Sequence, residues 1–328
     1  MIAYAARLLQ AGGVVALPTE TVYGLAADVT NEAAVRRIYA IKGRPLDHPL
    51  IVHLPGAELI ERYAVDVPES AHRLAAAFWP GPLTIVLRKS AEVPFNVTGG
   101  QSTVALRTID HPLTHAILAR FGGAVAAPSA NRFGRVSPTT AEHVQADLGD
   151  DVDLIVDGGP ARIGVESTIV DLTGGIPTIL RHGAIGATEL SAALGTQVAT
   201  QPGSTATVRA PGMLAAHYAP RAALILAEDG AAAATAAQLR ASGGHVAELT
   251  LPADPRSAAR SLYASLRALD AQGFDTIVVT LPADIEANAA VRDRLQRAAT
   301  PALTIAEVRR SWPRAAAPNR RLRTPRDP

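Results

Sequence analysis

Short apolar runs alternate with helical patterns in the first part of the chain. The runs are too short for helices and are typical of buried strands; they cover residues 14–17, 50–54, 83–87, 103–106, 123–127, 153–156, 169–172 and 178–180. Apolar positions recur at helical spacing in residues 31–41, 56–63, 69–78 and 112–121, and Asn31 is expected to cap the first of these helices. The pattern predicts a domain of the α/β class.

A second alternation begins after residues 194–210, a segment rich in threonine, glycine and serine. Beyond residue 221, the runs LILA, HVAEL, DTIVV and LTIAEV are separated by helical patterns over residues 230–241, 256–271 and 285–299. Such a βαβ series predicts a small parallel sheet. The series contains neither a G-x-G-x-x-G nor a Walker-type loop, so no motif marks it as a nucleotide site.

We therefore divide the chain into four parts. Residues 1–200 form the main domain, residues 201–220 a linker, residues 221–308 a smaller domain, and residues 309–328 a basic tail that we expect to be disordered. Linkers seldom contain aromatic residues. The pair His217-Tyr218 therefore predicts that the linker docks over the functional site.

Polar side chains follow two of the predicted strands. Residues 19–21, Thr-Glu-Thr, come after Pro18 at the end of the first strand, and residues 128–131, Pro-Ser-Ala-Asn, end the strand at 123–127 in the same way. Open α/β sheets place their ligand sites at strand ends. His53 adds a polar group to a run that is otherwise apolar. These positions together predict a polar cleft at the sheet.

Two cations, Lys42 and Arg44, follow the helix at 31–41 on a backbone that Gly43 and Pro45 direct out of the helix. Basic residues in this place commonly interact with the helix dipole, which contributes about 0.3–1 kcal/mol. The chain has 31 Lys and Arg residues, yet only two are lysine, so a compact ammonium at position 42 points to a specific role. Both interpretations stay open: a dipole partner and an anion-binding cleft.

Composition excludes several classes of protein. No apolar run approaches the roughly 20 residues that span a bilayer, and we expect no membrane association. The chain has no cysteine, which excludes disulfides, thiolate metal sites and a cysteine nucleophile, and a cytoplasmic location is expected. His111 and His115 have the spacing of a metal pair, but no acidic residue stands nearby. We therefore interpret His111 as a helix cap and predict no protein-bound metal site.

The net charge of +1 is unevenly distributed. Residues 309–328 contain seven arginines and one aspartate, which gives this tail a charge of +6 and the remaining residues a charge of −5. Domains that bind nucleic acid usually carry a basic surface of their own. The charge therefore favours at most a weak RNA contact, made by the tail.

Five segments, taken in order, resemble the long form of the YrdC-like family, the threonylcarbamoyl-AMP synthases. They cover much of the main domain and the linker, and the βαβ region resembles the second domain of this long form. The segments are PTETVYGL at 18–25, KGRPLDHPLIVH at 42–53, PSANRFGRVSPT at 128–139, ESTIVDL at 166–172 and PGMLAAHYAP at 211–220.

The resemblance implies both a fold and a reaction. The fold is a YrdC-like twisted mixed sheet with a large concave cavity, plus a smaller C-terminal Rossmann-like domain with a parallel sheet. The reaction converts L-threonine, bicarbonate and ATP into threonylcarbamoyl-AMP and pyrophosphate, for the threonylcarbamoyladenosine of tRNA. The product would pass to a tRNA threonylcarbamoyl transferase. Mg²⁺ is the implied cofactor, held through phosphate oxygens, and the oligomeric state stays open.

Site residues carry over from the family by motif. Lys42 and Arg44 are the predicted catalytic cations and would hold the ATP phosphates. The further predicted ATP contacts are His48, Thr103, Ser129, Asn131, Ser137, Arg181 and Tyr218. The predicted L-threonine contacts are Thr21, His53, Arg107, the backbone of Ala127, and Ser167. Arg107 would clamp the carboxylate, a bidentate role that suits a guanidinium.

Two positions depart from the family pattern, and two other functions stay open. His48 stands where Asn or Lys is frequent, and the linker lacks a basic residue after Met213. The alternatives are a non-catalytic protein that binds double-stranded RNA and a carbamoyl transferase of metallocentre maturation. The charge distribution argues against the first, and the absence of cysteine argues against the second.

Overall fold

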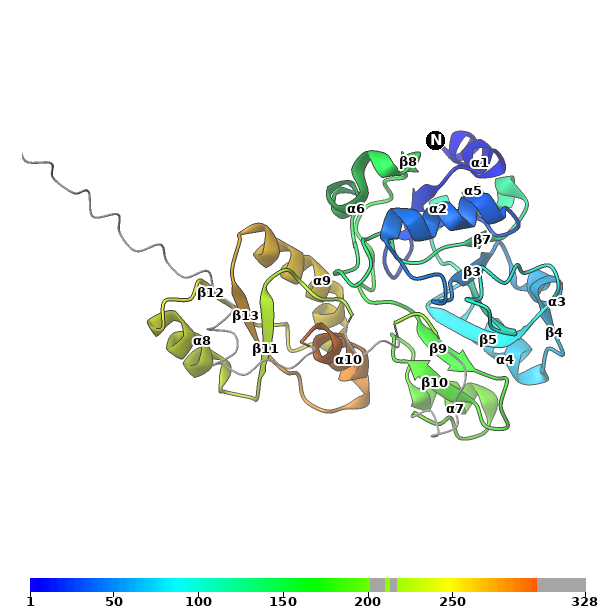
Figure 1. Ribbon diagram of the computed structural model, residues 1–328. Helices are drawn as coiled ribbons and strands as arrows, with labels where there is room; N and C mark the ends of the chain where they lie inside the picture. Colours follow the sequence, from blue (N-terminus) through cyan, green and yellow to red (C-terminus); the bar gives the residue numbers. More distant parts are fainter. Residues whose placement is uncertain (201–209, 213–216, 300–328) are drawn as a thin grey trace, which may run out of the picture.

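The computed structural model describes residues 1–200, 210–212 and 217–299 (Figure 1). Within them the chain forms a large main domain and a smaller second domain that lies beside it. The predicted strand at 303–308, the basic tail and most of the predicted linker lie outside the described residues. The two-domain α/β architecture agrees with the sequence prediction.

The main domain is built on a mixed sheet with the strand order β10-β9-β5-β6-β3-β7-β2-β1-β8, and β4 pairs with β5. The sheet is mixed because β3 and β6 run parallel whereas β5 and β6 run antiparallel. Its strands are β1 (Val15–Leu17), β2 (Gly24–Asp28), β3 (Ile51–Leu54), β4 (Ala64–Val65), β5 (Leu83–Lys89), β6 (Thr103–Thr108), β7 (Val125–Ala126), β8 (Leu154–Ile155), β9 (Thr168–Asp171) and β10 (Thr178–Arg181).

Helices pack against this sheet. They are α1 (Ile2–Gln10), α2 (Glu32–Lys42), α3 (Ile60–Tyr63), α4 (Glu69–Phe78), α5 (Pro112–Phe121), α6 (Ala141–Leu148) and α7 (Ala187–Leu194), with 3₁₀ turns η1 (Ala57–Leu59) and η2 (Gly149–Asp151). Helix α2 shows how local sequence sets an element. Asn31 accepts a hydrogen bond from the Ala34 N–H and caps its start, and Gly43 ends it at a φ of 63°.

The second domain is a three-stranded parallel sheet in the order β11-β13-β12. Its elements are β11 (Ala223–Ala227), α8 (Ala232–Ala241), β12 (Val246–Leu249), α9 (Pro255–Ala271), β13 (Thr276–Thr280), η3 (Glu286–Asn288) and α10 (Ala289–Ala298). Apolar side chains of α9 and α10 share one core with the main domain, in which Val136 and Val165 pack with Leu262 and Leu295. Burying this core holds the two domains together.

The sequence analysis missed strands β2 and β4 and helix α7. Strand β2 has the sequence GLAAD and helix α7 the sequence ATELSAAL. Alanine and glycine give strand β2 little hydrophobic contrast, so its pairing with β1 and β7 rather than its own pattern defines it. Arg107 is the penultimate residue of β6, which extends two residues beyond the predicted run at 103–106. Strand pairing with β3 extends β6 past the apolar run.

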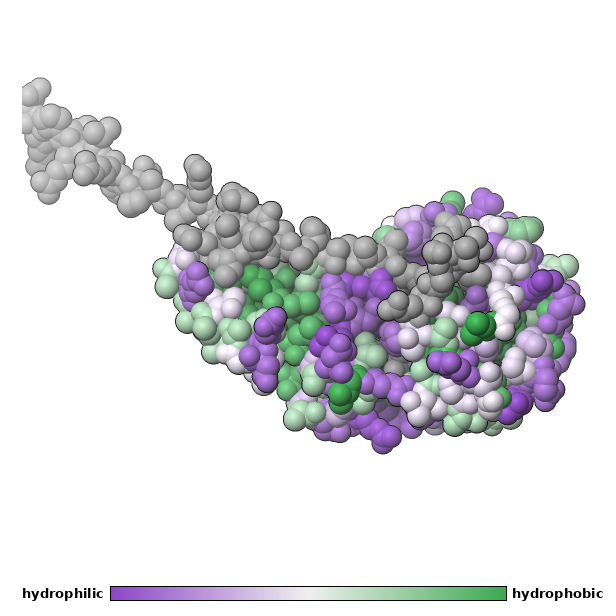
Figure 2. Space-filling view, turned by 90° about the horizontal axis from the view of Figure 1, so that it is seen from below, coloured by the Kyte–Doolittle hydropathy of each residue, from purple (hydrophilic) through white to green (hydrophobic). Residues whose placement is uncertain are grey.

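The surface differs between the two domains. Figure 2 shows hydrophilic residues gathered near the junction of the domains and a hydrophobic area over part of the second domain. Among the residues that the structure describes, no helix has both the length and the apolar character needed to cross a membrane.

Candidate active site

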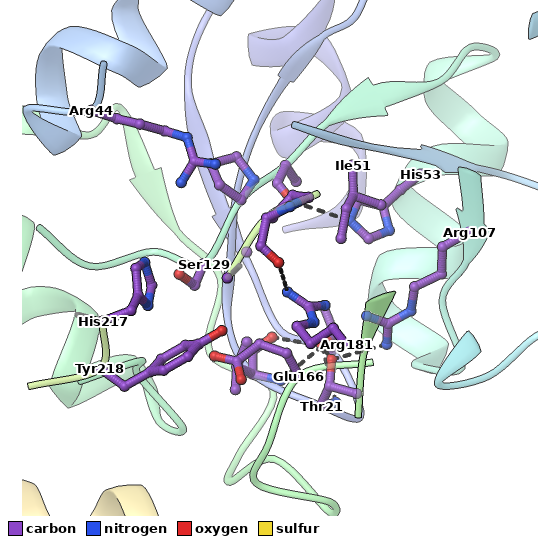
Figure 3. A pocket seen from close by; sticks show the side chains of 17 residues that line it. Thr21, Arg44, Ile51, His53, Arg107, Ser129, Glu166, Arg181, His217 and Tyr218 are labelled. Atoms are coloured by element: carbon purple, nitrogen blue, oxygen red, sulfur yellow. Dashed lines mark hydrogen bonds between the residues drawn. The ribbon is translucent and has the colours of Figure 1, made fainter. Parts of the chain in front are cut away.

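A cavity opens on the main domain where the ends of several strands meet the linker (Figure 3). It encloses about 530 Å³ of empty space, with open solvent at its mouth included. Its walls come from the loop before β2, from β3, β6 and β10, and from the segment after β7. The lining residues are Thr19, Thr21, Val22, Gly24, Arg44, Ile51, His53, Arg107, Ala127, Pro128, Ser129, Glu166, Arg181, Pro211, Gly212, His217 and Tyr218.

Arg107 is a buried cation held in one orientation. Its Nη2 donates to Glu20 Oε1 at 2.6 Å and to Thr21 Oγ1 at 2.9 Å. Its Nε donates to the Gly81 carbonyl at 3.1 Å. The side chain is 4% exposed and Glu20 is 2% exposed, so this is a buried ion pair at the base of the cavity. Such a guanidinium is preorganised because its rotamer is set before any ligand arrives.

Arg44 lines the opposite wall of the cavity. Its Nη2 donates to the Pro49 carbonyl at 2.8 Å, and its guanidinium lies 5.6 Å from the centre of the Phe133 ring. Burial lowers the pKa of Arg44 to about 10, which leaves the group charged at neutral pH. In Figure 3, Arg44 and Arg107 lie on different sides of the cavity, which therefore has two separate cationic regions.

Lys42 lies beneath the cavity rather than in its wall. Its Nζ donates to the carbonyls of Ser129 and Asn131 at 2.5 and 2.6 Å, and the residue is 2% exposed. Burial lowers its pKa well below the ordinary value, and Arg44 adds to the effect. The ammonium thus fastens the segment after β7, which supplies Ser129 to the cavity. This explains the lysine physically, since a planar guanidinium suits two converging carbonyls less well.

Arg181 connects the main domain to the linker. Its Nε and Nη2 donate to the carbonyl and the hydroxyl of Ser167 at 3.0 Å, and its Nη1 donates to the Pro211 carbonyl at 3.0 Å. Ser167 also exchanges a hydrogen bond with Thr84 at 2.8 Å. Among the described linker residues, Pro211, Gly212, His217 and Tyr218 line the cavity. Docking of the whole linker over the site stays a prediction.

Two buried histidines face the cavity in their neutral forms. Burial lowers the pKa of His53 to about 3, with a further contribution from Arg107, and burial also lowers that of His217 to about 3. His53 Nε2 lies 3.2 Å from the Ala127 carbonyl, so the neutral ring carries its proton there. Its Nδ1 is then a buried acceptor, and it has no hydrogen-bond partner in the described part of the chain.

These histidines predict a loss of stability in mild acid. Below pH 6.5 the unfolded chain binds protons that folded His53 and His217 exclude, so the free energy of unfolding falls as the pH drops from 6.5 towards 3. At pH 5 we expect a loss of about 2 kcal/mol for each histidine. Urea unfolding at pH 7 and pH 5 measures it.

The His53→Gln variant is the control for this prediction. Its amide can still donate to the Ala127 carbonyl but does not titrate. The variant should lose about 2 kcal/mol less stability than the natural chain between the two pH values. An equal loss in both proteins would contradict the role assigned to His53.

The structure brings most of the predicted site residues together. Those in the cavity wall are Thr21, Arg44, His53, Arg107, Ala127, Ser129, Arg181 and Tyr218. Four others, Lys42, Asn131, Ser137 and Ser167, lie outside the wall. Lys42, Ser137 and Ser167 hydrogen-bond to the lining residues Ser129, Glu166 and Arg181, whereas Asn131 accepts from Lys42. The His48 ring contacts the Phe133 ring, with ring centres 5.4 Å apart, and Phe133 in turn contacts Arg44 in the wall. Thr103 pairs with Arg88 at the start of β6 and is not part of the wall.

Several lining residues were not singled out from the sequence. Glu166 stands at the start of the motif ESTIVDL, so that motif was a signal for it. Glu20, from the polar cluster 19–21, is not in the wall and pairs with the lining residue Arg107. Ile51 and Val22 carry no chemical signal and contribute apolar surface to the wall. The rings of Phe133 and His217, 5.8 Å apart, add a contact that only the fold shows.

Comparisons with known proteins agree with this geometry. Residues 7–183 match the family model Sua5_yciO_yrdC, described as "Telomere recombination", and residues 185–300 match the C-terminal domain of threonylcarbamoyl-AMP synthase. A threonylcarbamoyl-AMP synthase of Pyrococcus abyssi is 39% identical, with coverage of 90% of this chain and 93% of the relative. One of Bacillus subtilis is also 39% identical, with coverage of 91% and 92%.

A solved structure shows the same fold. The crystal structure of P. abyssi Sua5 complexed with L-threonine superposes with a TM-score of 0.86 at 38% identity, covering 91% of this chain and 94% of that one. Fold and cavity therefore define a two-domain enzyme of the YrdC-like class. Within this class, the chain belongs to the threonylcarbamoyl-AMP synthase family, in its long form. The activity is ATP-dependent nucleotidyl transfer that makes threonylcarbamoyl-AMP for tRNA modification.

Proposed function

We propose that the cavity holds L-threonine against Arg107 and ATP against Arg44 and Arg181. The observation that carries this proposal is the convergence of separate cations on one cavity from β6, β10 and the turn after α2. Thr21, His53 and the carbonyl of Ala127 surround the Arg107 region, which suits a small zwitterion with a hydroxyl. Since Nε and Nη2 of Arg107 are engaged by the protein, Nη1 would meet the substrate carboxylate.

The reaction places modest demands on these residues. The threonine amine bonds to the carbon of bicarbonate and a C–O bond breaks, so that water leaves and a carbamate remains. The carbamate oxygen then attacks the α-phosphorus of ATP, and the bond to the leaving pyrophosphate breaks. Such a transfer depends on alignment and charge neutralisation rather than on a protein nucleophile. In our proposal Arg107 orients the threonine, and the unpartnered Nδ1 of His53 accepts a hydrogen bond from it. Arg44 and Arg181 stabilise charge on the phosphates.

Lys42 has a different role in this proposal from the one predicted from sequence. Its ammonium bonds to the carbonyls of Ser129 and Asn131, so it supports the phosphate side of the cavity from beneath. His48, Ser129, Asn131, Ser137 and Tyr218 remain predicted neighbours of the ATP, and Ser167 of the threonine. The contact of Thr103 with ATP also stays a prediction.

Mg²⁺ fits this site as an ion bound to the nucleotide rather than to protein side chains. Glu166 is the one carboxylate in the cavity wall formed by the described residues, and both of its oxygens accept hydrogen bonds from the protein. No cluster of three or more possible metal ligands occurs in residues 1–200, 210–212 and 217–299. We therefore propose that phosphate oxygens and water hold the ion. The ion would supply charge neutralisation on the triphosphate.

Further partners follow from the product. A mixed anhydride of a carbamate and AMP reacts readily with water, so we propose that it passes to a tRNA threonylcarbamoyl transferase. A weak RNA contact by the arginine-rich residues 309–328 and a cytoplasmic location remain part of this proposal.

The proposed function is tested by pyrophosphate release. The purified chain with ATP, L-threonine, bicarbonate and Mg²⁺ should release pyrophosphate, and the release should stop when threonine is omitted. L-alanine, which lacks the hydroxyl that His53 or Thr21 would bind, is the control substrate and should be much poorer. Release that is independent of threonine would show that the cavity accepts another substrate.

A further inference from the structure

Glu166 is a carboxylate in a cavity that we propose for a polyanion. It is 6% exposed and lies on the segment just before β9, between Tyr218 and Arg181 in Figure 3. Ser137 Oγ donates to its Oε1 at 2.5 Å. Burial alone would raise the pKa of this carboxyl, but Arg294 and Arg181 lower it to about 2, so the group is charged. A buried charge beside a triphosphate disfavours binding unless another charge compensates it.

The compensating charge comes from the second domain. Arg294 of α10 donates from Nε to Glu166 Oε2 at 2.8 Å, and Tyr263 of α9 donates from its hydroxyl to the same oxygen at 2.9 Å. The side chain of Arg294 is 0% exposed and is fixed further by Asp293 and by the His182 carbonyl. Both partners are distant from Glu166 in sequence, by 128 and 97 residues.

The same two side chains also seat the linker. The ring of Tyr218 stacks on that of Tyr263 with centres 5.9 Å apart and planes 25° apart. The Arg294 guanidinium lies 5.0 Å from the centre of the Tyr218 ring. Tyr218 has a φ of 63°, which costs a residue with a side chain about 1–2 kcal/mol, so its surroundings must hold it there. Tyr263 and Arg294 provide these surroundings.

We propose that Arg294 and Tyr263 are positioning residues for ATP: docking of the second domain neutralises Glu166 and seats Tyr218, and the cavity accepts the triphosphate only in this arrangement. The proposal rests on the proposed ATP site. Neither residue lines the cavity, so each acts through Glu166 and Tyr218. Without Arg294, Glu166 would attract Arg181, the cation that we assign to the phosphates, and would also repel the nucleotide.

The test compares ATP and threonine in two variants. Arg294→Gln removes the charge but keeps amide donors, and we expect it to raise the KM for ATP at least about tenfold while the KM for threonine changes less than about threefold. Tyr263→Phe removes one hydroxyl and should raise the KM for ATP about threefold. Arg292→Gln, on the same helix α10 but paired with Asp284 in the second domain, is the matched control and should change neither constant.

A double-mutant cycle separates charge compensation from a structural role. In a Glu166→Gln background the carboxylate charge is gone, so adding Arg294→Gln should change the KM for ATP by less than about threefold. An undiminished effect in that background, or equal losses of ATP and threonine binding, would overturn the proposal. If Arg294→Gln does not fold, Tyr263→Phe tests the proposal instead. A KM for ATP in Tyr263→Phe equal to that of the natural chain would contradict the proposal. Threonine-dependent pyrophosphate release by the natural chain, measured first, tests the proposed function separately.

Discussion

Replacing Arg107 with alanine should raise the KM for L-threonine by about 30- to 700-fold, while the KM for ATP changes less than about threefold. Loss of a charged hydrogen bond in a buried site costs on the order of 2–4 kcal/mol, which gives this range. The effect should be selective because Arg107 and Arg44 occupy different sides of the cavity. Steady-state kinetics with each substrate varied in turn measures it.

The Arg107→Ala variant also leaves Glu20 as an unpaired buried carboxylate, so its stability needs a separate measurement. Arg107→Lys keeps the charge beside Glu20 but loses the planar fork, and it should raise the KM for threonine by about tenfold with little loss of stability. Arg88→Ala is the matched control on the neighbouring strand β5, where Arg88 is 65% exposed and pairs with Asp66 at the surface. Equal losses for both substrates in Arg107→Lys would remove the role assigned to Arg107.

Replacing Arg44 with alanine should have the opposite selectivity. We expect the KM for ATP to rise by about 10- to 100-fold, since a hydrogen bond to a charged group contributes about 1.5–3 kcal/mol, and the KM for threonine to change little. Arg44 is 8% exposed and its guanidinium is held against the Pro49 carbonyl and the Phe133 ring, so it would meet the nucleotide in a set orientation. Titration with a non-hydrolysable ATP analogue measures binding without turnover.

Arg132 provides the control for Arg44. It lies in the neighbouring segment, is 46% exposed and pairs with Asp151 outside the cavity. Arg132→Ala should bind the analogue as the natural chain does. If Arg132→Ala and Arg44→Ala weaken binding equally, the effect is the general loss of positive charge, and the phosphate site lies elsewhere.

Much of the fold could be predicted because local physical signals agreed with the tertiary arrangement. Asn31 and Gly43 bracket helix α2 by capping chemistry that operates within a few residues. The βαβ alternation after residue 221 predicted the parallel order that the second domain shows. Strand β2 was missed because its alanines and glycine say little about burial, and only its two neighbours in the sheet define it.

For the candidate site, the sequence predicted which residues take part better than it predicted where their side chains lie. The resemblance to the family predicted Arg44, Arg107 and Arg181 as site residues, and all three line the cavity, although only Arg44 lies in one of the five segments. The resemblance also predicted Lys42, yet its ammonium lies beneath the wall and bonds to two carbonyls. A motif records which residues a site needs, but it does not separate those that face the cavity from those that support it. That difference depends on side-chain direction, which the sheet and its loops set.

The sequence by itself determined the two-domain plan, the motif set and hence the family, because strand and helix periodicity and short motifs are local properties of the chain. Only the tertiary structure decided that Glu166 faces the cavity and that Tyr263 and Arg294 of another domain neutralise it. The physical reason is distance along the chain. Contacts between residues about a hundred positions apart arise from the packing of whole elements, and no local pattern of hydrophobic and polar residues encodes which side chains will meet.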